Sequence, residues 1–309
     1  MRPRGGLERS RQRVELDDGD FVDLDWTVAV DGRAVESEAP LVLVLHGLEG
    51  SAESDYVQQI IRALARRGLA SVALNFRSCS GEMNRLARFY HSGDTADAAH
   101  AIVLIRRRFP GRSLGAVGFS MGGNVLLKHL GECGQADRSD AEVEAAVAIS
   151  VPFDLTAGID TIERGLGRLY QLYFLRRLRR KLQLKDDLLR DEVDLDRLLR
   201  VRSLRAFDDL GTAPLHDFLD SADYYRRASS KPYLTAIRIP TLLIQSEDDP
   251  FQPRTALPRE EVATNPHLEA SFTPNGGHVG FVSGSPWSPR FWAESTAADF
   301  LADRLGVCE

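Results

Sequence analysis

Gly118-Phe119-Ser120-Met121-Gly122 has the form Gly-x-Ser-x-Gly and lies between a short apolar run and a run with helical spacing. Residues 114–117 have the composition of a buried strand, and the apolar residues of 125–130 can line the inner side of a helix. A tight turn from strand to helix needs small residues around a serine, so that the backbone can bend and the hydroxyl can stand exposed. The stretch therefore predicts that Ser120 is a nucleophile at the end of a strand. The plainer alternative is a glycine-rich connection capped by a serine.

An acid and a histidine follow Ser120 in the chain order that is typical of proteins with a serine on such a strand-to-helix turn, each after an expected strand. Residues 241–245 predict a short buried strand, and Glu247-Asp248-Asp249-Pro250-Phe251-Gln252-Pro253 comes next. The acid of such a site stands just after the strand, in an Asp-x-x-x-Pro setting, so we expect it to be Asp249. Asp248 is the nearest competitor. One of the two acids is expected to have only a turn-forming role, since Asp and Pro both favour turns.

The histidine is expected in the loop after the last strand. Residues 268–272 predict that strand, and Asn275-Gly276-Gly277-His278 then presents a histidine on a flexible glycine loop. A single loop histidine is more often a surface residue, but His278 occurs where a general base is needed. We therefore expect His278 to take the proton of Ser120, and Asp249 to fix the imidazole.

Another apolar strand is expected to end in a loop that binds an oxyanion. Residues 41–45 are all apolar, as in a parallel strand buried on both faces, and His46-Gly47-Leu48-Glu49-Gly50 follows. The glycines let the backbone turn so that the amide of Leu48 points into the site. The second donor should be the amide of Met121, the residue after the serine. His46 is expected to organise this loop by hydrogen bonds rather than to act as a base.

Strand and helix signals alternate along most of the chain, which predicts an α/β fold with a mostly parallel, doubly wound sheet. Further elements are expected at 13–16 and 21–30 (an opening hairpin), 56–67 (helix), 70–75 (strand), 94–108 (helix) and 143–149 (strand). Residues 286–305 should close the fold, with Phe291, Trp292, Phe300 and Leu301 on a packing face. We expect 1–152 and 221–309 to form the core. Residues 153–220, which have few strand signals, are expected to be an inserted helical cap.

An apolar stripe with helical spacing runs beside a basic run within the expected cap. The stripe consists of Leu166, Leu169, Tyr170, Tyr173, Phe174 and Leu178, and the basic run consists of Arg176, Arg177, Arg179, Arg180 and Lys181. We expect a cap helix with its apolar face over a pocket and a solvated basic face, and we expect Tyr224 and Tyr225 to add to the pocket roof. Peripheral contact with an anionic membrane is the alternative that is not favoured.

Composition excludes several classes of protein. The 309 residues carry a net charge of −6, which gives no general attraction to nucleic acid. The three cysteines, Cys79, Cys133 and Cys308, are odd in number and scattered, which favours a reducing compartment over a disulfide framework. No apolar run approaches the length of a membrane span, and no apolar stretch follows the charged residues 1–6. We therefore expect a cytoplasmic protein.

Motifs for metals and nucleotides are absent from the sequence. It has no His-Glu-x-x-His, no paired Cys-x-x-Cys, no Walker lysine and no third glycine after Gly165-Leu166-Gly167. We expect no cofactor and no metal. Cys79 is expected to be a small buried thiol rather than a site residue, and His91 is expected to organise its own loop.

Several blocks of sequence together resemble one family. They are His46-Gly47-Leu48-Glu49-Gly50-Ser51, Asn75-Phe76-Arg77-Ser78-Cys79-Ser80-Gly81-Glu82, Tyr90-His91-Ser92-Gly93-Asp94, the residues 118–124, Asp223-Tyr224-Tyr225, Asp248-Asp249-Pro250-Phe251 and Gly276-Gly277-His278-Val279-Gly280-Phe281. With these blocks, the chain resembles the YheT-like branch of the α/β-hydrolases from about residue 14 to its end. This branch is described as hydrolases or esterases and is related to the mammalian α/β-hydrolase-domain lipid hydrolases.

The resemblance implies an α/β-hydrolase fold and a Ser-Asp-His triad at Ser120, Asp249 and His278. Such proteins usually carry an Asn-Pro-His-Leu-Gln-Thr-like motif before the first strand, and this sequence has none, so the resemblance does not define the outer wall of the pocket. The expected function is that of a serine esterase of the EC 3.1.1 type, which cleaves small, uncharged and lipid-like acyl esters through an acyl-enzyme. An acyltransferase on the same triad and a non-catalytic binding protein of the same fold are the alternatives.

Overall fold

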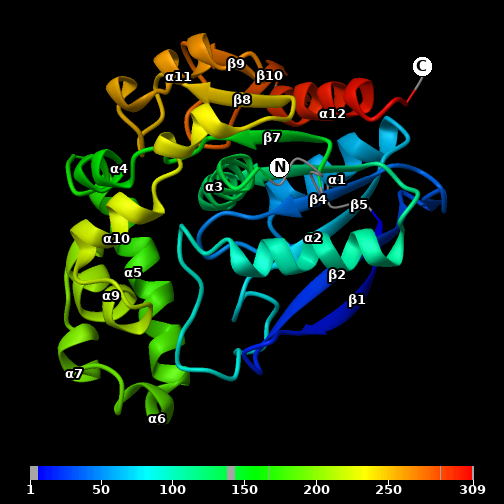
Figure 1. The fold of residues 1–309 in the computed structure, drawn as a ribbon. Coiled ribbons are helices and arrows are strands. Elements are labelled where there is room, and N and C mark those ends of the chain that lie inside the picture. Colours follow the sequence, from blue (N-terminus) through cyan, green and yellow to red (C-terminus); the bar gives the residue numbers. More distant parts are fainter. Residues whose placement is uncertain (1–5, 138–142, 166, 286, 308–309) are drawn as a thin grey trace.

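The computed structural model describes residues 6–137, 143–165, 167–285 and 287–307 (Figure 1). Within these residues a nine-stranded sheet has the order β1-β2-β5-β4-β6-β7-β8-β9, and β3 pairs with β2. Strands β4 to β9 run parallel to one another, whereas β1, β2 and β3 pair antiparallel and β2 joins the parallel strands by antiparallel pairing with β5. The strands are β1 (Leu7–Glu15), β2 (Phe21–Val30), β3 (Arg33–Ala34), β4 (Leu41–Leu45), β5 (Ala70–Asn75), β6 (Leu114–Phe119), β7 (Ala145–Ile149), β8 (Thr241–Ser246) and β9 (Leu268–Thr273).

Strand β4 shows how helices cover both faces of the sheet. Leu41, Leu43 and Leu45 pack in one hydrophobic cluster with α2 (Ala96–Arg108) and α3 (Met121–Gln135). Val42 and Val44 pack in a second cluster with α1 (Asp55–Arg66) and α12 (Trp292–Arg304). Successive side chains of a strand point to opposite faces, so an entirely apolar strand needs cover on both sides. The expected doubly wound α/β sheet is confirmed.

The bounds of most elements agree with the expected ones to within a few residues. Strands β4 and β5 have the expected bounds, α2 begins at 96 rather than 94, and β7 begins at 145 rather than 143. The largest difference is β1, which begins at 7 rather than 13. Its first residues alternate between exposed and half-buried and are mostly polar, so they give no apolar pattern; backbone pairing with β2 holds them in the strand.

The C-terminal segment is more varied than expected. A two-stranded sheet of β10 (Val282–Ser285) and β11 (Ser288–Phe291) precedes α12. Of the residues expected on a packing face, Trp292, Phe300 and Leu301 of α12 pack in the hydrophobic cluster shared with α1. Pro286 lies outside the described residues. Strand β10 is fully exposed, which explains why no hydrophobic pattern predicted it.

The residues between β7 and α10 (Ser221–Ala228) fold as helices in the part that the structure describes. They are α4 (Leu155–Ile162), α5 (Gly167–Leu184), α6 (Asp186–Leu189), α7 (Leu195–Leu198), α8 (Leu204–Phe207), a π-helical turn (Asp208–Thr212) and α9 (Ala213–Leu215). Most of them surround a hydrophobic cluster of their own, which includes Leu175, Leu182 and Leu198. We call 153–220 the cap, and its bounds stay a prediction. The remaining helical pieces are two 3₁₀ turns (Lys231–Ala236 and Arg254–Ala256) and α11 (Arg259–Thr264).

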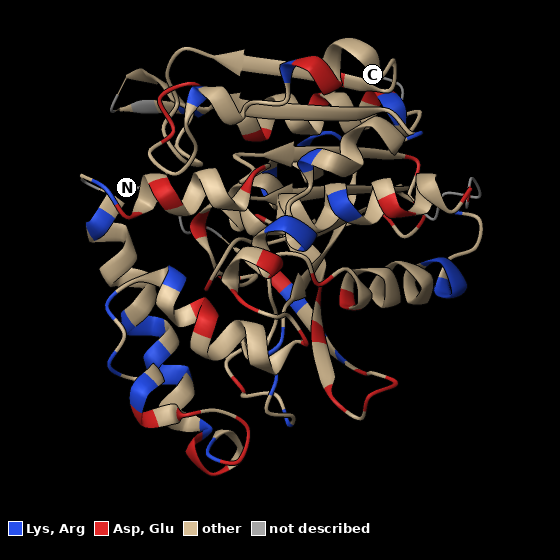
Figure 2. Cartoon of the chain, turned by 60° about the vertical axis from the view of Figure 1, so that its left-hand side comes forward, with Lys and Arg blue, Asp and Glu red and all other residues tan. Residues whose placement is uncertain are grey.

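The apolar stripe expected on the cap helix α5 is only partly buried. Leu169, Tyr170 and Tyr173 are exposed, whereas Gln171, Leu175 and Leu182 are buried. Of the expected stripe, Phe174 and Leu178 pack partly against the cap cluster, and Leu166 lies outside the described residues. The reason is that α5 carries apolar side chains around more than one face, so spacing alone does not choose between them. Basic side chains follow the same helix (Figure 2).

A polar cluster around Arg77 connects the opening hairpin with the cap. The Arg77 guanidinium donates to Asp97 at 2.7 and 2.8 Å, and to Asp18 at 2.7 Å and Asp20 at 3.2 Å in the hairpin turn. The side-chain amide nitrogen of Asn84 donates to Asp20 at 2.5 Å, and its oxygen accepts from Lys185 of the cap at 2.7 Å. Burial lowers the pKa of Lys185 to about 8.

None of the helices in the described residues has the length and apolar content that crossing a membrane requires.

Candidate active site

Ser120 lies at the tight turn between β6 and α3. Its φ is +51°, a left-handed conformation that is rare for a residue with a side chain. The backbone around it is crowded: a Cβ atom at Gly122 would lie 2.4 Å from the carbonyl oxygen of His46, and one at Gly118 would lie 2.5 Å from that of Gly122. Glycine is therefore required at both positions, and the sequence pattern supplies it.

Ser120, His278 and Asp249 form one chain of hydrogen bonds. The Oγ of Ser120 lies 2.9 Å from Nε2 of His278. On the other side of the ring, Nδ1 lies 2.9 Å from Oδ2 and 3.1 Å from Oδ1 of Asp249. Because the carboxylate accepts the Nδ1 hydrogen, Nε2 is left to accept the hydrogen of the serine hydroxyl. The structure thus brings together three residues that are 129 and 29 positions apart in the chain.

The two neighbouring acids have different surroundings. Asp249 is buried, and besides the imidazole it accepts hydrogen bonds from the side chain of Gln245 at 2.7 Å and from the amide of Phe251 at 2.8 Å. Asp248 instead accepts from the amides of Gly276 at 2.9 Å and Gly277 at 2.8 Å. The hydrogen bond from the Gly277 amide contributes most to lowering the pKa of Asp248 below its ordinary value, and the hydrogen bond from the Gly276 amide also lowers this pKa. Asp248 therefore holds the loop that carries His278, and Asp249 contacts the histidine itself.

The loop after β4 lies against the serine. A Cβ atom at Gly47 would be only 3.1 Å from the Cβ of Ser120. Leu48, in this loop, and Met121, the first residue of α3, both line the same pocket. The amide of neither residue donates a hydrogen bond to another described residue. Two amides near one serine hydroxyl, both without an acceptor, have the composition of an oxyanion hole.

His46 holds the start of this loop and is fully buried. Its Nε2 accepts from the amide of Phe76 at 3.2 Å, so the hydrogen is on Nδ1, which donates to the carbonyl oxygen of Gly47 at 2.8 Å. Burial lowers the pKa of His46 to about 4, which keeps the ring neutral at pH 7. These contacts agree with the organising role expected from the sequence.

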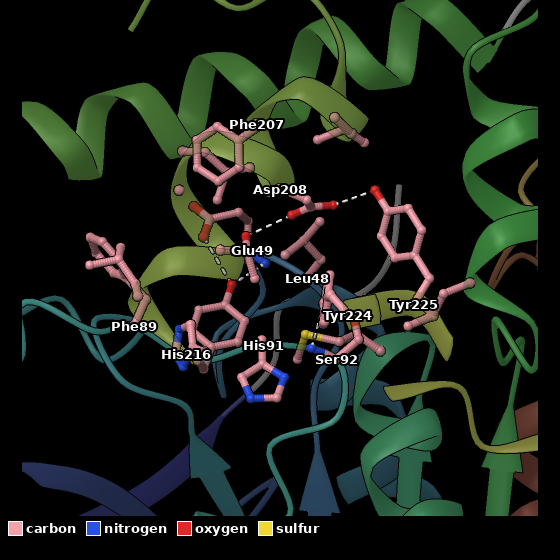
Figure 3. Close-up of a pocket in the computed structure, with 18 of the residues that line it drawn as sticks. Leu48, Glu49, Phe89, His91, Ser92, Phe207, Asp208, His216, Tyr224 and Tyr225 are labelled. Atoms are coloured by element: carbon pink, nitrogen blue, oxygen red, sulfur yellow. Dashed lines mark hydrogen bonds between the residues drawn. The ribbon is translucent and has the colours of Figure 1, made fainter. Parts of the chain in front are cut away.

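A pocket of about 120 Å³ lies between the core and the cap (Figure 3). Its wall is mainly apolar, as is usual for a small-molecule site. The apolar lining includes Leu48, Met121, Leu155, Ile159, Leu178, Leu182, Leu204, Phe207 and Leu215. Tyr224 and Tyr225 also line it, as expected from the sequence.

Asp208 is a carboxyl group at one end of this pocket, beside Phe207 (Figure 3). It accepts hydrogen bonds from the hydroxyls of Tyr225 at 2.7 Å and Thr212 at 2.6 Å. Burial raises its pKa to about 6. Sequence reasoning missed Asp208, because a single Asp in a charged helical region gives no signal of its own.

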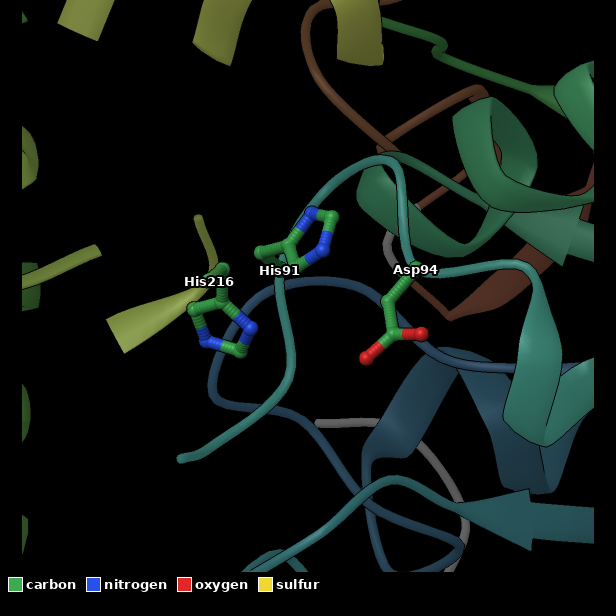
Figure 4. Close-up of side chains that lie close together, drawn as sticks. All are labelled: His91, Asp94 and His216. Atoms are coloured by element: carbon green, nitrogen blue, oxygen red, sulfur yellow. The ribbon is translucent and has the colours of Figure 1, made fainter. Parts of the chain in front are cut away.

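His91 and His216 lie at the other end of the pocket, with Asp94 near them (Figure 4). One ligand atom of each residue lies within 4.8 Å of the others. Nδ1 of His91 already accepts from the amide of Gly93 at 3.1 Å, and Asp94 accepts from Arg88 at 2.8 Å. A histidine that binds a metal through one ring nitrogen normally donates a hydrogen bond from the other. Nδ1 of His91 accepts a hydrogen bond instead, so these contacts fit two neutral imidazoles packed together better than a metal site. They also agree with the expectation that His91 organises its loop.

Two further side chains near the site make contacts that the sequence did not predict. Phe251 packs its ring 4.2 Å from that of His278 and 4.8 Å from that of Tyr170 in α5, centroid to centroid. Cys79 is partly rather than fully buried, and its Sγ lies 3.2 Å from Nζ of Lys181 in α5. Contacts of this kind join segments that are far apart in the chain, so local patterns cannot predict them.

The fold and this geometry define a class. Residues 40–285 match the family model for the alpha/beta hydrolase fold, and the chain belongs to the α/β-hydrolase family. Within it, the chain is 42% identical over 298 residues to the Escherichia coli (strain K12) protein YheT, whose name gives esterase as a provisional activity. That match covers 95% of this chain and 85% of YheT. The resemblance to the YheT-like branch is thereby confirmed.

Two eukaryotic relatives have lipid hydrolase names. Phospholipase ABHD3 of Mus musculus is 31% identical over 285 residues, which cover 90% of this chain and 67% of that protein. Monoacylglycerol lipase of Saccharomyces cerevisiae is 30% identical over 260 residues, 80% of this chain and 57% of that protein.

Solved structures support the fold. The Pyrococcus furiosus esterase Pf2001 superimposes with a TM-score of 0.62 at 18% identity, over 97% of this chain and 92% of the esterase. Brefeldin A esterase gives a TM-score of 0.60 at 18% identity, over 99% and 79% of the two chains.

Proposed function

We propose that the protein is a serine hydrolase that cleaves carboxylic esters of small, lipid-like substrates. The observation that carries the proposal is the continuous chain of hydrogen bonds from Ser120 through His278 to Asp249, beside two amides without acceptors. A binding protein has no need of this arrangement, which gives the serine a base and gives the base an orienting carboxylate.

The reaction follows from the positions of these groups. Ser120 Oγ attacks the acyl carbonyl carbon while Nε2 of His278 takes its proton, and Asp249 stabilises the resulting imidazolium. The amides of Leu48 and Met121 donate to the oxyanion. Because Met121 is the first residue of α3, the positive end of the helix dipole also stabilises this charge. The imidazolium then protonates the leaving alcohol. Water, deprotonated by His278, then attacks the acyl carbon; when the bond from this carbon to Ser120 Oγ breaks, His278 returns the proton to Oγ and the acid is released.

The apolar lining of the pocket favours a substrate with an uncharged acyl group, which would bind beside the amides of Leu48 and Met121. Leu48 and Met121 line its wall together with leucines of the cap, so a chain attached to the carbonyl would contact apolar side chains. The lipase and phospholipase names of two relatives favour the same class of substrate.

Labelling with a fluorophosphonate probe tests the proposal. Ser120→Ala should remain folded, lose labelling completely and lose ester hydrolysis by about 10³-fold or more. Ser295→Ala, at an exposed position of α12, is the matched control and should label like the natural protein. Labelling that persists in Ser120→Ala would place the nucleophile elsewhere. Acyl transfer to an added alcohol in preference to water would identify an acyltransferase instead.

A further inference from the structure

Three consecutive amides in the loop after β4 have different partners. The amide of Gly47 donates to the hydroxyl of Tyr56 at 2.9 Å, and the amide of Glu49 donates to the hydroxyl of Tyr90 at 2.8 Å. Only the amide between them, that of Leu48, has no acceptor among the described residues. The two tyrosines thus hold the peptide units on both sides of the Gly47–Leu48 peptide, which is the unit that carries the Leu48 amide.

Glu49 is the residue of this loop that the cap contacts. Its φ is +56°, and its side chain is only 2% exposed. Oε1 accepts from Nζ of Lys181 at 2.7 Å and from the hydroxyl of Tyr90 at 2.9 Å. Arg177, one turn earlier in α5, donates to the Glu49 carbonyl oxygen at 2.9 Å and lies 3.6 Å from Oε2. Helix α5 therefore contacts both the carboxylate and the backbone of Glu49.

The charges explain why these contacts depend on one another. A buried carboxylate is stable only when it is paired and hydrogen-bonded. Lys181 is itself largely buried, and burial alone lowers the pKa of its amine. The neighbouring Cys79 and Glu49 outweigh this effect and raise the pKa above its ordinary value, so the amine stays charged. Burial keeps Tyr90 neutral by raising its pKa, so its hydroxyl can accept from the Glu49 amide and donate to the carboxylate.

We propose that Lys181 and Arg177 of the cap are positioning residues for the oxyanion hole and act on the Leu48 amide through Glu49 and Tyr90. Docking of α5 then completes the catalytic site as well as covering the pocket. This inference rests on the proposed function, because it concerns the donor that would stabilise the oxyanion. A donor displaced from the oxyanion weakens binding of the transition state more than binding of the ester.

Steady-state kinetics on a soluble p-nitrophenyl ester test the inference, with Lys181→Met as the main variant. Loss of one oxyanion donor costs about 10²- to 10³-fold in kcat, so its displacement should cost about 10- to 100-fold, with KM changed by less than about threefold. Affinity for a trifluoromethyl ketone, which forms a tetrahedral adduct, should fall by a similar factor. Lys181→Arg should restore most of both. Arg180→Met, an exposed position on the same helix without a polar contact to another described residue, is the charge-matched control.

A double-mutant cycle identifies the route through Glu49. Glu49→Gln with Lys181→Met should be no slower than Glu49→Gln alone, because the lysine then has no carboxylate to hold. An unchanged kcat in folded Lys181→Met, or a change in KM only, would overturn the inference. Lys181 would then only line the pocket. If Lys181→Met does not fold, Tyr90→Phe decides by the same two readouts. Failure of the proposed function would appear separately, as fluorophosphonate labelling that does not depend on Ser120.

Discussion

At the scale of single residues, the adjacent acids Asp248 and Asp249 differ by what their oxygens contact. Asp249→Asn should lower kcat by about 10³- to 10⁴-fold, because an amide would favour the wrong tautomer of His278. Asp248→Asn keeps one oxygen for the amides of Gly276 and Gly277 and should cost much less. Measured kcat/KM of both variants on one ester checks this ranking. The reverse order would assign the triad acid to Asp248.

The raised pKa of Asp208 predicts a pH dependence of stability. In the folded protein this carboxyl group has a pKa of about 6, against an ordinary value of 3.8. Between these values the folded state holds more protons than the unfolded state, so the contribution of Asp208 to stability is present at pH 4 and is lost as the pH rises through 6. Asp208 is partly exposed to the pocket, so we expect the loss to be about 1 to 2 kcal/mol.

Urea unfolding of the natural protein and of Asp208→Asn at pH 4, 5, 6 and 7 measures this loss. The free energy of unfolding of the natural protein, minus that of the variant, should fall by about 1 to 2 kcal/mol from pH 4 to pH 7, because asparagine does not titrate. A difference that stays constant with pH would show that Asp208 does not titrate as described.

The three residues of the proposed triad could be predicted from the sequence, whereas the residues that hold the loop beside them could not. Ser120, Asp249 and His278 follow fixed local patterns, and the structure brings them within hydrogen-bonding distance. Tyr56 and Tyr90 leave no such pattern, because their contacts with the loop after β4 depend on how α1 and a distant loop pack.

At the scale of elements, the parallel strands could be predicted well, whereas the orientation of α5 could not. A strand such as β4 is apolar on both faces, and a run of only five apolar residues next to a glycine turn favours a buried strand over a helix. Helix α5 has apolar side chains on its exposed face and on its buried face. The hydrophobic pattern therefore predicts a helix but does not show which face contacts the core.

The buried face of α5 gives a prediction about substrate length. Leu178 lines the pocket, and Leu178→Ala should enlarge it, which should shift the preferred p-nitrophenyl ester towards longer acyl chains. Leu172→Ala, at a 57% exposed position of the same helix, should leave the preference unchanged. Relative kcat/KM over a series of chain lengths measures the effect. Equal profiles for Leu178→Ala and the natural protein would mean that the acyl group binds elsewhere.

At the scale of the whole molecule, the cap has a hydrophobic cluster separate from the two clusters of the sheet. Regions with their own small core open at lower free energy than the main core. Hydrogen exchange followed by mass spectrometry should therefore show α5 to α8 exchanging before β4, β6 and β7 at low denaturant concentration. Exchange of the cap and the sheet at one common rate would mean that they unfold only together.

The Arg77 cluster also bears on the order in which the chain can fold during synthesis. The opening hairpin leaves the ribosome first, but its turn contacts Arg77 and Asn84, and Asn84 in turn contacts Lys185. Asp20 is fully buried in the finished protein, yet within the hairpin its carboxylate accepts only from the amide of Phe21, and its partners Arg77 and Asn84 emerge later. More than half of the chain must therefore be made before the earliest strands are fully packed, so the nascent hairpin must remain exposed during that interval.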